Sequence, residues 1–566
     1  MARTVAIGIQ DFDKLIEGKY FYIDKTSFIK EWWESGDDVT LITRPRRFGK
    51  TLNMSMLDYF FSVNHADKGS LFEGLEIWND EKYRELQGTY PVIYLSFANI
   101  KERNYKSIRK TMCQLIAKLY HKNDFLLESG LLGELDKRYF RRVSEEMDDS
   151  DAALSLYQLS DFLYRYYGKK VIILLDEYDT PMQEAYINGF WDELAAFTRS
   201  LFNSTFKTNP YLERGIMTGI TRVSKESIFS DLNNLEVVTT TSDKYATAFG
   251  FAEEEVFAAL DECGYGEEKE KVKRWYDGFT FGKHTDIYNP WSIINFIDKG
   301  KYDVYWANSS SNGLVNKLVR ESGYRTKETF ENLIEGQCIY TPIDEQVVYN
   351  YLDNNESAIW SLLLASGYLK VISYERQELI GDEEAKYELQ ITNNEVRIMF
   401  LEMIRGWFNG AKAEYNDFIK SLLAGRLKEM NAYMNNVALR TFSYFDTGKG
   451  PCGAEPEKFY HGFVLGLIVE LRRDYVITSN RESGYGRYDI VIEPKNPDEH
   501  DAIIIEFKVH DEDDEASLRD TVQAALAQIE EKKYAENLVE RGIARDRIRS
   551  YGFAFEGKKV LIGQGL

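Results

Sequence analysis

The sequence of 566 residues predicts an α/β protein, with a parallel sheet in the first half and a second α/β domain at the C-terminus. Three observations support this prediction. In the first half, short apolar runs alternate with stretches of helical periodicity, which is typical of a parallel sheet covered on both faces. The first run is followed by Gly-Lys-Thr at residues 49–51, and a later run ends in Asp-Glu at residues 176–177. Near the C-terminus, another apolar run leads into Glu-Phe-Lys at residues 506–508.

The composition is that of a globular protein with several domains. Hydrophobic residues make up 44% and charged residues 29%, with only 10 prolines, which excludes a disordered chain. At roughly 100 to 200 residues a domain, the length predicts three or four domains. No apolar run approaches the roughly 18 residues that span a bilayer, and the first residues lack a secretory signal pattern, so we expect a cytoplasmic protein with no membrane partner. The 4 scattered cysteines favour reduced thiols over disulfides or zinc ligands.

The formal net charge of -22 argues against a chain that coats nucleic acid or anionic membranes non-specifically. It does not exclude a local site. Contact with a polyanion would then depend on confined basic clusters or bound cations, and salt would weaken it.

The segment VTLITRPRRFGKT has the order strand, loop, helix that a phosphate-binding P-loop requires. In such a loop Lys50 reaches the β and γ phosphates and Thr51 ligates a magnesium ion. The backbone N–H groups around Phe48 to Thr51 meet the negative charge at the helix N-terminus, and Arg47, just before them, is counted with the nucleotide-binding residues.

Arg44 stands where the P-loop pattern has its opening glycine. That glycine serves the entry turn, whereas Gly49 permits close approach of the backbone to phosphate, so Arg44 and Pro45 can form a different and stiffer entry. Arg44, Arg46 and Arg47 also add positive charge beside the loop, and a solvated basic turn is the alternative for each. The loop by itself leaves nucleotide binding open.

The five apolar residues 171–175 predict a strand that is buried on both faces. Asp176 then lies at the carboxyl end of the strand, where parallel sheets place their ligands, and is expected to hold magnesium through water. Glu177 is positioned to polarise an attacking water. A lone Asp-Glu pair after an apolar run usually marks only the point where a strand reaches solvent. The upstream Gly-Lys-Thr favours the interpretation that Asp176 and Glu177 act at a nucleotide site.

Three more runs, which begin near Tyr90, Arg214 and Leu235, predict further strands of the same sheet. Thr221 and Arg222 follow the fourth strand, where ATPases of this kind place polar residues that sense the γ phosphate. Pairing of Arg222 with a surface carboxylate is the alternative.

Five segments resemble the AAA-ATPase-like proteins that carry a PD-(D/E)XK nuclease domain at the C-terminus, and the resemblance continues to the end of the chain. They are YFYIDKTSFI, RPRRFGKT, LLDEYD, TGITRVSKESIFSDLNNL and FGFAEEEV. The resemblance implies an AAA-like P-loop domain that binds ATP and Mg²⁺, and a restriction-endonuclease-like C-terminal domain. The family's loop also carries arginine in place of the first glycine. Ala252 departs from the Ser or Thr expected to cap the helix that begins EEEV.

The middle of the chain is expected to hold a lid and a winged-helix-like module. Residues 245–345 are rich in helix and aromatic residues, and Trp275 and Trp291 are expected in the lid core rather than as ligand platforms. An apolar helix ending near Gly367 and two strand-like runs then suggest a winged helix. Its wing is acidic, which favours a protein-facing or intramolecular module over a DNA-binding one. A protein partner or a homo-oligomer through this domain is left open.

The run DAIIIEFKVH places Glu506 and Lys508 at alternate positions of a strand, so their side chains point to the same face. By themselves they would be read as an ion pair. Asp489, at the start of an earlier strand, completes the Asp then Glu-x-Lys order of the PD-(D/E)XK nucleases. Asp489 and Glu506 are expected to hold Mg²⁺ or Mn²⁺, and Lys508 to orient or activate a water.

Two flanking helices add Glu470, as an extra metal ligand, and Gln528 to this candidate site. In the resembling family these positions belong to the nuclease pattern. A helix-surface charge is the alternative for Glu470, and a solvated side chain is the alternative for Gln528.

The sequence therefore predicts four domains. They are an ATPase domain at 1–244, a lid at 245–345, a winged-helix-like connector at 346–430 and a nuclease-like domain at 431–566. The leading hypothesis is an ATP-regulated, metal-dependent nuclease, with DNA favoured over RNA by analogy of fold. The alternative is an ATP-dependent switch that binds a partner and whose nuclease-fold domain does not cut. The net charge and the acidic wing favour this alternative.

Overall fold

The computed structural model forms two compact units, each of which is described by itself. The first comprises Met1–Leu318 and Gly336–Met399, and the second Val319–Glu335 and Phe400–Leu566. The boundaries expected at residues 244, 345 and 430 stay predictions. The residues described are 3–222, 228–229, 232–307, 315, 318–319, 324–344, 356–375, 386–407, 412–441, 464, 468, 471, 474–483, 486–497, 499–510, 515–556 and 559–565.

The first unit is built on a parallel sheet of five strands in the order β2-β3-β4-β1-β5. All six residues of β3 are buried, because helices cover both faces of the sheet. The five strands lie at the five runs that the sequence predicted, and the α/β fold class is confirmed. The strands are β1 (Val39–Thr43), β2 (Val92–Ser96), β3 (Val171–Asp176), β4 (Leu212–Gly219) and β5 (Leu235–Val238).

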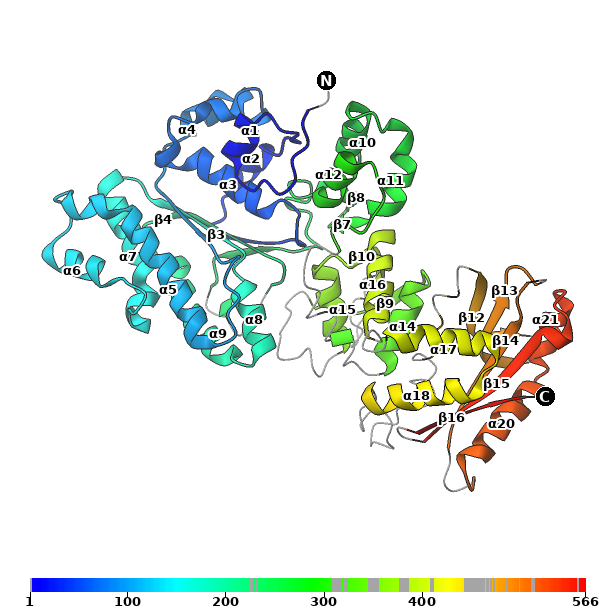
Figure 1. Ribbon diagram of the computed structural model, residues 1–566. Helices are drawn as coiled ribbons and strands as arrows, with labels where there is room; N and C mark the ends of the chain where they lie inside the picture. The colour runs from blue at the N-terminus through cyan, green and yellow to red at the C-terminus, as the bar shows by residue number, and fades with distance from the viewer. Residues whose placement is uncertain are drawn as a thin grey trace. The chain divides into compact units, whose positions relative to one another are not determined.

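Helices cover this sheet in two layers (Figure 1). Helix α3 contacts β2 and β3 on one face, and α5, α7 and α9 pack together on the other. On that second face, Ile173 and Leu175 of β3 share one core with Phe162 of α7 and Leu201 of α9. The helices are α1 (Phe12–Glu17), α2 (Ser27–Ser35), α3 (Lys50–Phe61), α4 (Glu81–Leu86), α5 (Tyr105–Lys122), α6 (Glu134–Arg142), α7 (Asp149–Tyr167), α8 (Thr180–Asn188) and α9 (Trp191–Phe202).

The strand order decides which loops meet. Strand β4 lies between β1 and β3, and all three are parallel. Their carboxyl ends therefore share one edge of the sheet. The loop after β1, the acidic pair after β3 and the turn after β4 converge at this edge.

Three helices and a small antiparallel sheet follow the parallel sheet. Their core is aromatic, with Tyr276, Tyr288 and Phe296 buried together. Helix α10 begins at Glu253 without a Ser or Thr cap, because the carboxylate of Glu255 accepts a hydrogen bond from the N–H of Ala252 (2.7 Å). The elements are α10 (Glu253–Glu262), α11 (Lys269–Tyr276), α12 (Pro290–Lys299), β6 (Phe251–Ala252), β7 (Phe279–Phe281) and β8 (His284–Tyr288).

A helix and a hairpin complete the first unit, as the sequence suggested. Helix α15 ends two residues before Gly367, whose φ of 83° is left-handed. Strands β10 and β11 then pair antiparallel, and β9 adds to β11. The acidic connector at 376–385 lies outside the described residues, and the winged-helix interpretation stays a prediction. The elements are β9 (Ile339–Thr341), α15 (Glu356–Ala365), β10 (Leu369–Glu375) and β11 (Lys386–Ile391), and α16 (Asn394–Trp407) begins in the first unit and ends in the second.

The second unit contains a mixed sheet in the order β12-β13-β14-β15-β16, in which only β14 and β15 are parallel. Residues of α17 and α18 share the core on one face of the sheet, and residues of α20 share the core on the other. This α/β arrangement is the one expected for the C-terminal domain. The elements are α14 (Tyr324–Ile334), α17 (Lys412–Ala424), α18 (Leu427–Thr441), β12 (Tyr475–Ser483), β13 (Gly486–Pro494), β14 (Ala502–Val509), α20 (Leu518–Glu531), α21 (Tyr534–Glu540), β15 (Ile548–Glu556) and β16 (Lys559–Gln564).

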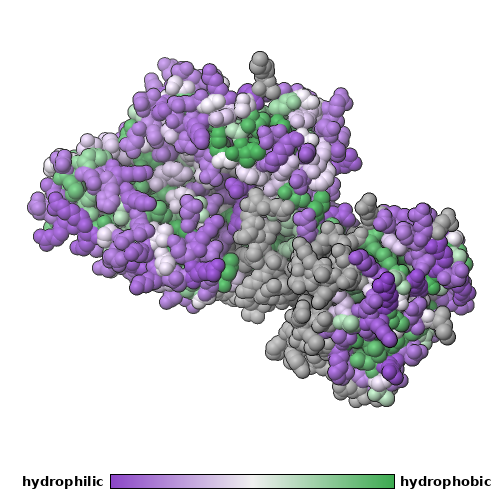
Figure 2. Space-filling model, in the orientation of Figure 1, coloured by the Kyte–Doolittle hydropathy of each residue, from purple (hydrophilic) through white to green (hydrophobic). Residues whose placement is uncertain are grey.

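Hydrophilic residues predominate on the visible face of the described parts, with scattered hydrophobic patches between them (Figure 2). Across the described ranges, no helix has both the length and the apolar character needed to cross a membrane.

Candidate nucleotide and metal sites

The loop between β1 and α3 has the backbone of a phosphate-binding turn. Gly49 caps α3 with a φ of 82°, a conformation that residues with a Cβ rarely adopt. A Cβ at Gly49 would meet no atom within 4 Å, so the space beside the loop is open. The first N–H groups of α3 have no partner within the helix and can receive an anion.

Lys50 is buried and folds back over this loop. Its Nζ donates to the carbonyl oxygens of Arg44 (2.9 Å) and Pro45 (2.8 Å). Burial lowers the pKa of Lys50, and the carboxylates of Glu177, Asp179 and Asp176 oppose this change. The ammonium group is thus held at the loop, within the field of the acidic residues at the end of β3 and in the turn that follows it.

Asp176, at the end of β3, accepts hydrogen bonds from the start of α3 and from the neighbouring strand β4. Thr51 Oγ1 donates to its Oδ2 (2.8 Å), and Thr218 Oγ1 of β4 donates to its Oδ1 (2.5 Å). Burial raises the pKa of Asp176, and the hydroxyl of Thr218, then that of Thr51, opposes the rise. The structure thus brings together Thr51 and Asp176, the two predicted magnesium ligands of this domain. Thr218 was not among the predicted site residues, because only the pairing of β3 with β4 places it beside Asp176.

Glu177 adopts a φ of 51°, which is unusual for a residue with a side chain. Its N–H donates to Thr218 Oγ1 (3.3 Å), and its carboxylate accepts from Thr180 Oγ1 (3.3 Å). Glu177 lines the cavity described below, whereas Asp176 beside it is buried. Strained backbone of this kind is concentrated at functional sites.

Arg44 does not face the phosphate side of the loop. Its guanidinium is fully buried, donates to the carbonyl oxygens of Thr43 (2.9 Å) and Thr239 (2.6 Å), and lies 4.3 Å from the ring centroid of Phe281. Burial lowers the pKa of Arg44 to about 9. Arg44 therefore ties the loop entry to the segment that follows β5, and this contact explains why a long side chain can replace the usual glycine.

A cavity of about 720 Å³ opens beside the loop. Its walls include the loop residues 46–53, Ile9 and Ile23 from the N-terminal segment, and Trp291 and Ile294 from α12. The volume lies within the usual range for small-molecule sites. The cavity combines a cationic loop with apolar side chains, which matches the two ends of a nucleotide.

The residues present fit ATP with a magnesium ion. An open turn at a helix N-terminus, a lysine and a hydroxyl–carboxylate pair are the donor set that a metal-bound triphosphate requires. Arg47, Phe48, Gly49, Lys50 and Thr51 all line the cavity. Their role in nucleotide binding stays a prediction.

Trp291, which the sequence placed in the lid core, packs partly buried against that core and also lines the cavity. The guanidinium of Arg47 lies over its ring, 4.4 Å from the centroid. Helix α12 thus contributes an aromatic wall to the cavity, beside a cation of the loop. Its helical context gave no signal of this second contact.

Thr221 and Arg222 follow β4 but are not among the described residues that line the cavity. Thr221 is buried, and its hydroxyl donates to Asp179 Oδ2 (3.1 Å). The Nε of Arg222 is buried and has no hydrogen-bond partner within the described part of the chain. The sensing of a γ phosphate by these two residues stays a prediction.

Lys25, which the sequence analysis did not single out, joins two of the segments that carry the resemblance. It belongs to YFYIDKTSFI, and its Nζ contacts the carboxylate of Glu255, in FGFAEEEV, at 2.7 Å. It also donates to the carbonyl oxygen of Thr247 (2.8 Å). Lys25 lines the cavity, so this buried ion pair connects the cavity wall to α10.

In the second unit, Asp489, Glu506 and Lys508 share one face of the mixed sheet. Strand β13 pairs antiparallel with β14 up to Ile490 opposite Ile505, so the next position places Asp489 opposite Glu506. Side chains opposite each other in such a ladder point to the same face. That face is the one on which α20 packs.

Both acids of this face form hydrogen bonds with neighbouring residues. The N–H of Phe507 donates to Asp489 Oδ2 (2.8 Å), and Gln528 Nε2 of α20 donates to Glu506 Oε1. Burial, then the carboxylate of Glu506, raises the pKa of Tyr534 to about 12, and the carboxylate of Asp489 adds to the rise.

Gly552 explains how α20 comes close to this face. It pairs with Glu506 in the parallel ladder, and a Cβ here would lie 2.9 Å from the carbonyl oxygen of Val522 and 3.1 Å from Ala525 Cβ. Only glycine permits this approach, which brings Gln528 to Glu506.

The carboxylates of Asp489 and Glu506 are hard oxygen donors of the kind that Mg²⁺ and Mn²⁺ prefer, so the donor set fits a divalent ion. Glu470 lies outside the described residues. The metal-binding and catalytic roles of Asp489, Glu506, Lys508 and Gln528 stay predictions.

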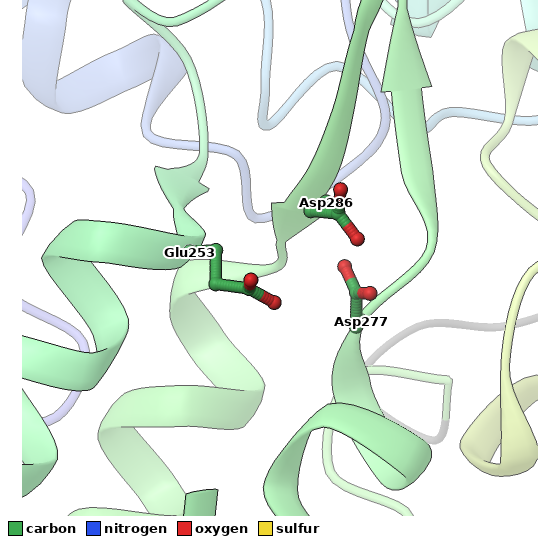
Figure 3. A group of neighbouring side chains, drawn as sticks. All are labelled: Glu253, Asp277 and Asp286. Carbon is green, nitrogen blue, oxygen red and sulfur yellow. The ribbon is translucent and has the colours of Figure 1, made fainter. Parts of the chain in front are cut away.

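A separate acidic cluster is formed by residues of α10 and β8 and by the residue that follows α11. Glu253, Asp277 and Asp286 each offer a carboxylate oxygen within 4.8 Å of the others, and the side chains converge in Figure 3. Lys273 lies in the same cluster, paired with Glu253 and at 3.0 Å from Asp286 and 3.9 Å from Asp277. The cluster already contains its own cation, which makes it an ion-pair network rather than a metal site.

The stability of the lid is expected to depend on pH through Asp277. Burial, and then the carboxyl of Asp286, raises the pKa of Asp277 to about 7. A raised pKa means that its stabilising contribution is complete below the unfolded value of about 4 and is lost as the pH rises through about 7. Asp277→Asn keeps the side chain neutral, so the melting temperature of the variant should exceed that of the wild type at about pH 8 and approach it at about pH 4.

The matched control is Asp298→Asn, because Asp298 is an exposed acid on α12. Its melting temperature should differ from that of the wild type by the same amount at about pH 4 and at about pH 8. Parallel melting curves for Asp277→Asn and the wild type across this pH range would contradict the prediction.

Family models match one segment in each of the two units. Residues 6–229 match the family model described as predicted AAA-ATPase, and residues 455–565 match the PD-(D/E)XK nuclease superfamily. A relative from Azotobacter chroococcum mcd 1, described as "Uncharacterized protein in vnfD 5'region", is 25% identical over 410 residues, which cover 71% of this chain and 70% of the relative.

Two solved structures share a weaker likeness. The match to a Walker-type ATPase of Pyrococcus abyssi covers 67% of this chain and 95% of that protein, at 13% identity and a TM-score of 0.36. The second structure is a Signal Transduction ATPase with Numerous Domains from Pyrococcus horikoshii, which has a tetratricopeptide repeat sensor. That match covers 80% of this chain and 53% of the other protein, at 12% identity and a TM-score of 0.23.

The resemblance seen in the sequence is confirmed by the two family matches, which account for the loop of the first unit and the acids of the second. The chain thus combines a segment that matches the predicted AAA-ATPase family with a C-terminal segment that matches the PD-(D/E)XK nuclease superfamily.

Proposed function

We propose that this protein is an ATP-regulated, metal-dependent nuclease that hydrolyses phosphodiester bonds, with DNA as its preferred substrate. The observation that carries the proposal is the presence of two separate sites in one chain. In the first unit Lys50, Thr51 and Asp176 meet beside a cavity, and in the second unit Asp489 and Glu506 meet on one face of a sheet.

In the first unit, each residue has a distinct role towards ATP. The backbone N–H groups of the loop and Lys50 bind the phosphates, while Thr51 and Asp176 hold the magnesium ion. Glu177 faces the cavity and orients the attacking water, and its strained backbone fixes the direction of the carboxylate. Arg222, and Thr221 beside it, respond to the γ phosphate.

In the second unit, Asp489 and Glu506 hold a divalent ion. When bound, such an ion lowers the pKa of a water and neutralises charge on the scissile phosphate. Gln528 donates to Glu506 and fixes the direction of its carboxylate. Lys508, two residues further along the same face, orients the water that attacks phosphorus.

Glu177→Gln is expected to lower ATP hydrolysis by about 10² to 10⁴-fold, because a positioned general base contributes a factor of that size. ATP affinity should stay within about threefold, since the amide keeps the shape of the side chain and the phosphate ligands remain. Single-turnover hydrolysis and calorimetric binding measure the two effects.

Glu184→Gln is the matched control, because Glu184 lines the same cavity from α8 and not from the end of β3. Equal loss of hydrolysis in both variants would remove the role assigned to Glu177.

The proposal as a whole is tested by incubating the purified protein with plasmid DNA, single-stranded DNA and RNA, with Mg²⁺ or Mn²⁺, in the presence and absence of ATP. Nicking of DNA that changes with ATP supports it. Cleavage of RNA alone would change the substrate, and cleavage that ignores ATP would remove the regulatory role of the first unit.

A second candidate function is an ATP-dependent switch that binds a protein partner without cutting. The formal net charge of -22 favours it, because an acidic protein repels a nucleic-acid backbone. Under this alternative the helix and hairpin of α15, β10 and β11 bind the partner or a second copy of the chain. The absence of cleavage on every substrate, with normal ATP binding, would favour it over the nuclease.

A further inference from the structure

A chain of polar side chains leads from the nucleotide cavity to the turn after β4. Arg46 and Gln183 both line the cavity, and Arg46 Nη2 donates to Gln183 Oε1 (3.2 Å). Gln183 Nε2 in turn donates to Asp179 Oδ2 (3.3 Å). Arg46, Gln183 and Asp179 are called the cavity relay below.

Asp179 holds the turn that follows β4. Its Oδ2 accepts hydrogen bonds from the N–H of Ile220 (2.9 Å) and from the N–H (3.0 Å) and hydroxyl (3.1 Å) of Thr221. The hydroxyl of Tyr178 donates to the carbonyl oxygen of Thr221 (2.7 Å). Asp179 is only 1% exposed, so these bonds form away from water and are stronger for that reason.

Gly219 permits this close contact between two loops. A Cβ at Gly219 would lie 2.7 Å from the ring of Tyr178 and 2.8 Å from Asp179 Oδ1. The segment after β3 and the turn after β4 are therefore packed so closely that a shift of Asp179 must move the turn.

Arg222 is the next residue of that turn. Its Nε is buried and has no hydrogen-bond partner among the residues that the structure describes. A guanidinium nitrogen in that position favours an anionic partner, because a buried polar group is costly when its hydrogen bonds are unmade. The bonds of Asp179 to Ile220 and Thr221 fix the backbone from which this side chain extends.

We propose that the cavity relay is a positioning device by which the protein distinguishes ATP from ADP. The proposal rests on the nucleotide binding proposed above. Arg46 lies in the phosphate loop, so a further phosphate changes the charge that its guanidinium faces. A movement of Arg46 shifts Gln183 and then Asp179 through their hydrogen bonds, and Asp179 positions the turn that carries Arg222. None of the three relay residues needs to touch the reacting atoms.

The test compares the affinities of the full-length protein for ADP and for a non-hydrolysable ATP analogue, both with magnesium, by calorimetry. The variants are Gln183→Leu, which removes both relay bonds from a half-buried position, and Asp179→Leu, which removes the acceptor for the turn. Asp179→Asn keeps an acceptor oxygen and should restore much of the effect. Asn188→Leu, an exposed amide on the same helix α8, is the matched control.

The wild type and Asn188→Leu should bind the ATP analogue more tightly than ADP. In Gln183→Leu and Asp179→Leu this preference should shrink about tenfold or more, the size of effect that a charge-assisted hydrogen bond has on affinity. Affinity for ADP should stay within about threefold.

If Gln183→Leu prefers the ATP analogue over ADP as strongly as the wild type does, the proposal is wrong. It is also wrong if the variant loses affinity for both nucleotides equally, because that result indicates a purely structural role. If Asp179→Leu fails to fold, Gln183→Leu decides. A wild type that binds neither nucleotide contradicts the proposed function itself, whereas one that binds both equally contradicts only the relay.

Discussion

Asp489→Ala is expected to lower the rate of plasmid nicking by about 10³-fold or more, because charge stabilisation by a bound metal is worth several kcal/mol of the barrier. Asp489 Oδ2 accepts a hydrogen bond from the N–H of Phe507, the neighbour of Glu506. The substitution removes the carboxylate of Asp489 and leaves that of Glu506. Lys508→Ala should have a similar effect on the rate while leaving metal binding intact. Nicking is measured by the conversion of supercoiled to open-circular plasmid.

Glu531→Ala is the matched control for these variants, since Glu531 is an exposed acid on α20, the helix that packs over the site. It should nick at the wild-type rate. If both Asp489→Ala and Lys508→Ala still nick DNA like the wild type, the assigned site is wrong. Metal binding by Asp489→Ala, measured by calorimetry with Mn²⁺, separates loss of the ion from loss of the fold.

Lys50→Ala is expected to weaken ATP binding by about 10²-fold or more, because the phosphate charge loses a buried cation that makes charge-assisted hydrogen bonds. The Nζ of Lys50 now donates to the carbonyls of Arg44 and Pro45, so it is already held at the loop. Calorimetry with ATP and magnesium measures the change in the dissociation constant.

Lys118→Ala, an exposed lysine on α5, is the control for charge and should bind ATP like the wild type. Unchanged ATP affinity in Lys50→Ala would show that this loop is not the nucleotide site. The same variant also tests regulation, since nicking by Lys50→Ala should no longer respond to ATP.

The strands that frame both sites followed from local pattern. The apolar runs at β1, β3 and β14 are buried throughout or nearly so, and such runs identify strands covered on both faces without knowledge of their neighbours. Alternation along β14 was enough to place Glu506 and Lys508 on one face.

The direction of Arg44 could not be predicted in this way. Its substitution for glycine was visible in the sequence, but its partners, Thr239 and Phe281, lie about two hundred residues away. The same holds for Lys25 and Glu255, whose ion pair joins two recognisable motifs. No local pattern states which distant carbonyl or carboxylate a buried cation will meet.

The sequence by itself determined the two sets of motifs and the elements that carry them, because hydrophobic periodicity and turn residues act over a few neighbouring positions. Only the tertiary structure decided which side chains meet. Asp176 is 125 residues from Thr51 and 42 from Thr218, and it contacts both because β4 lies between β1 and β3. Gln528 reaches Glu506 because Gly552 lets α20 approach the sheet, a consequence of packing that exists only when all three segments are assembled.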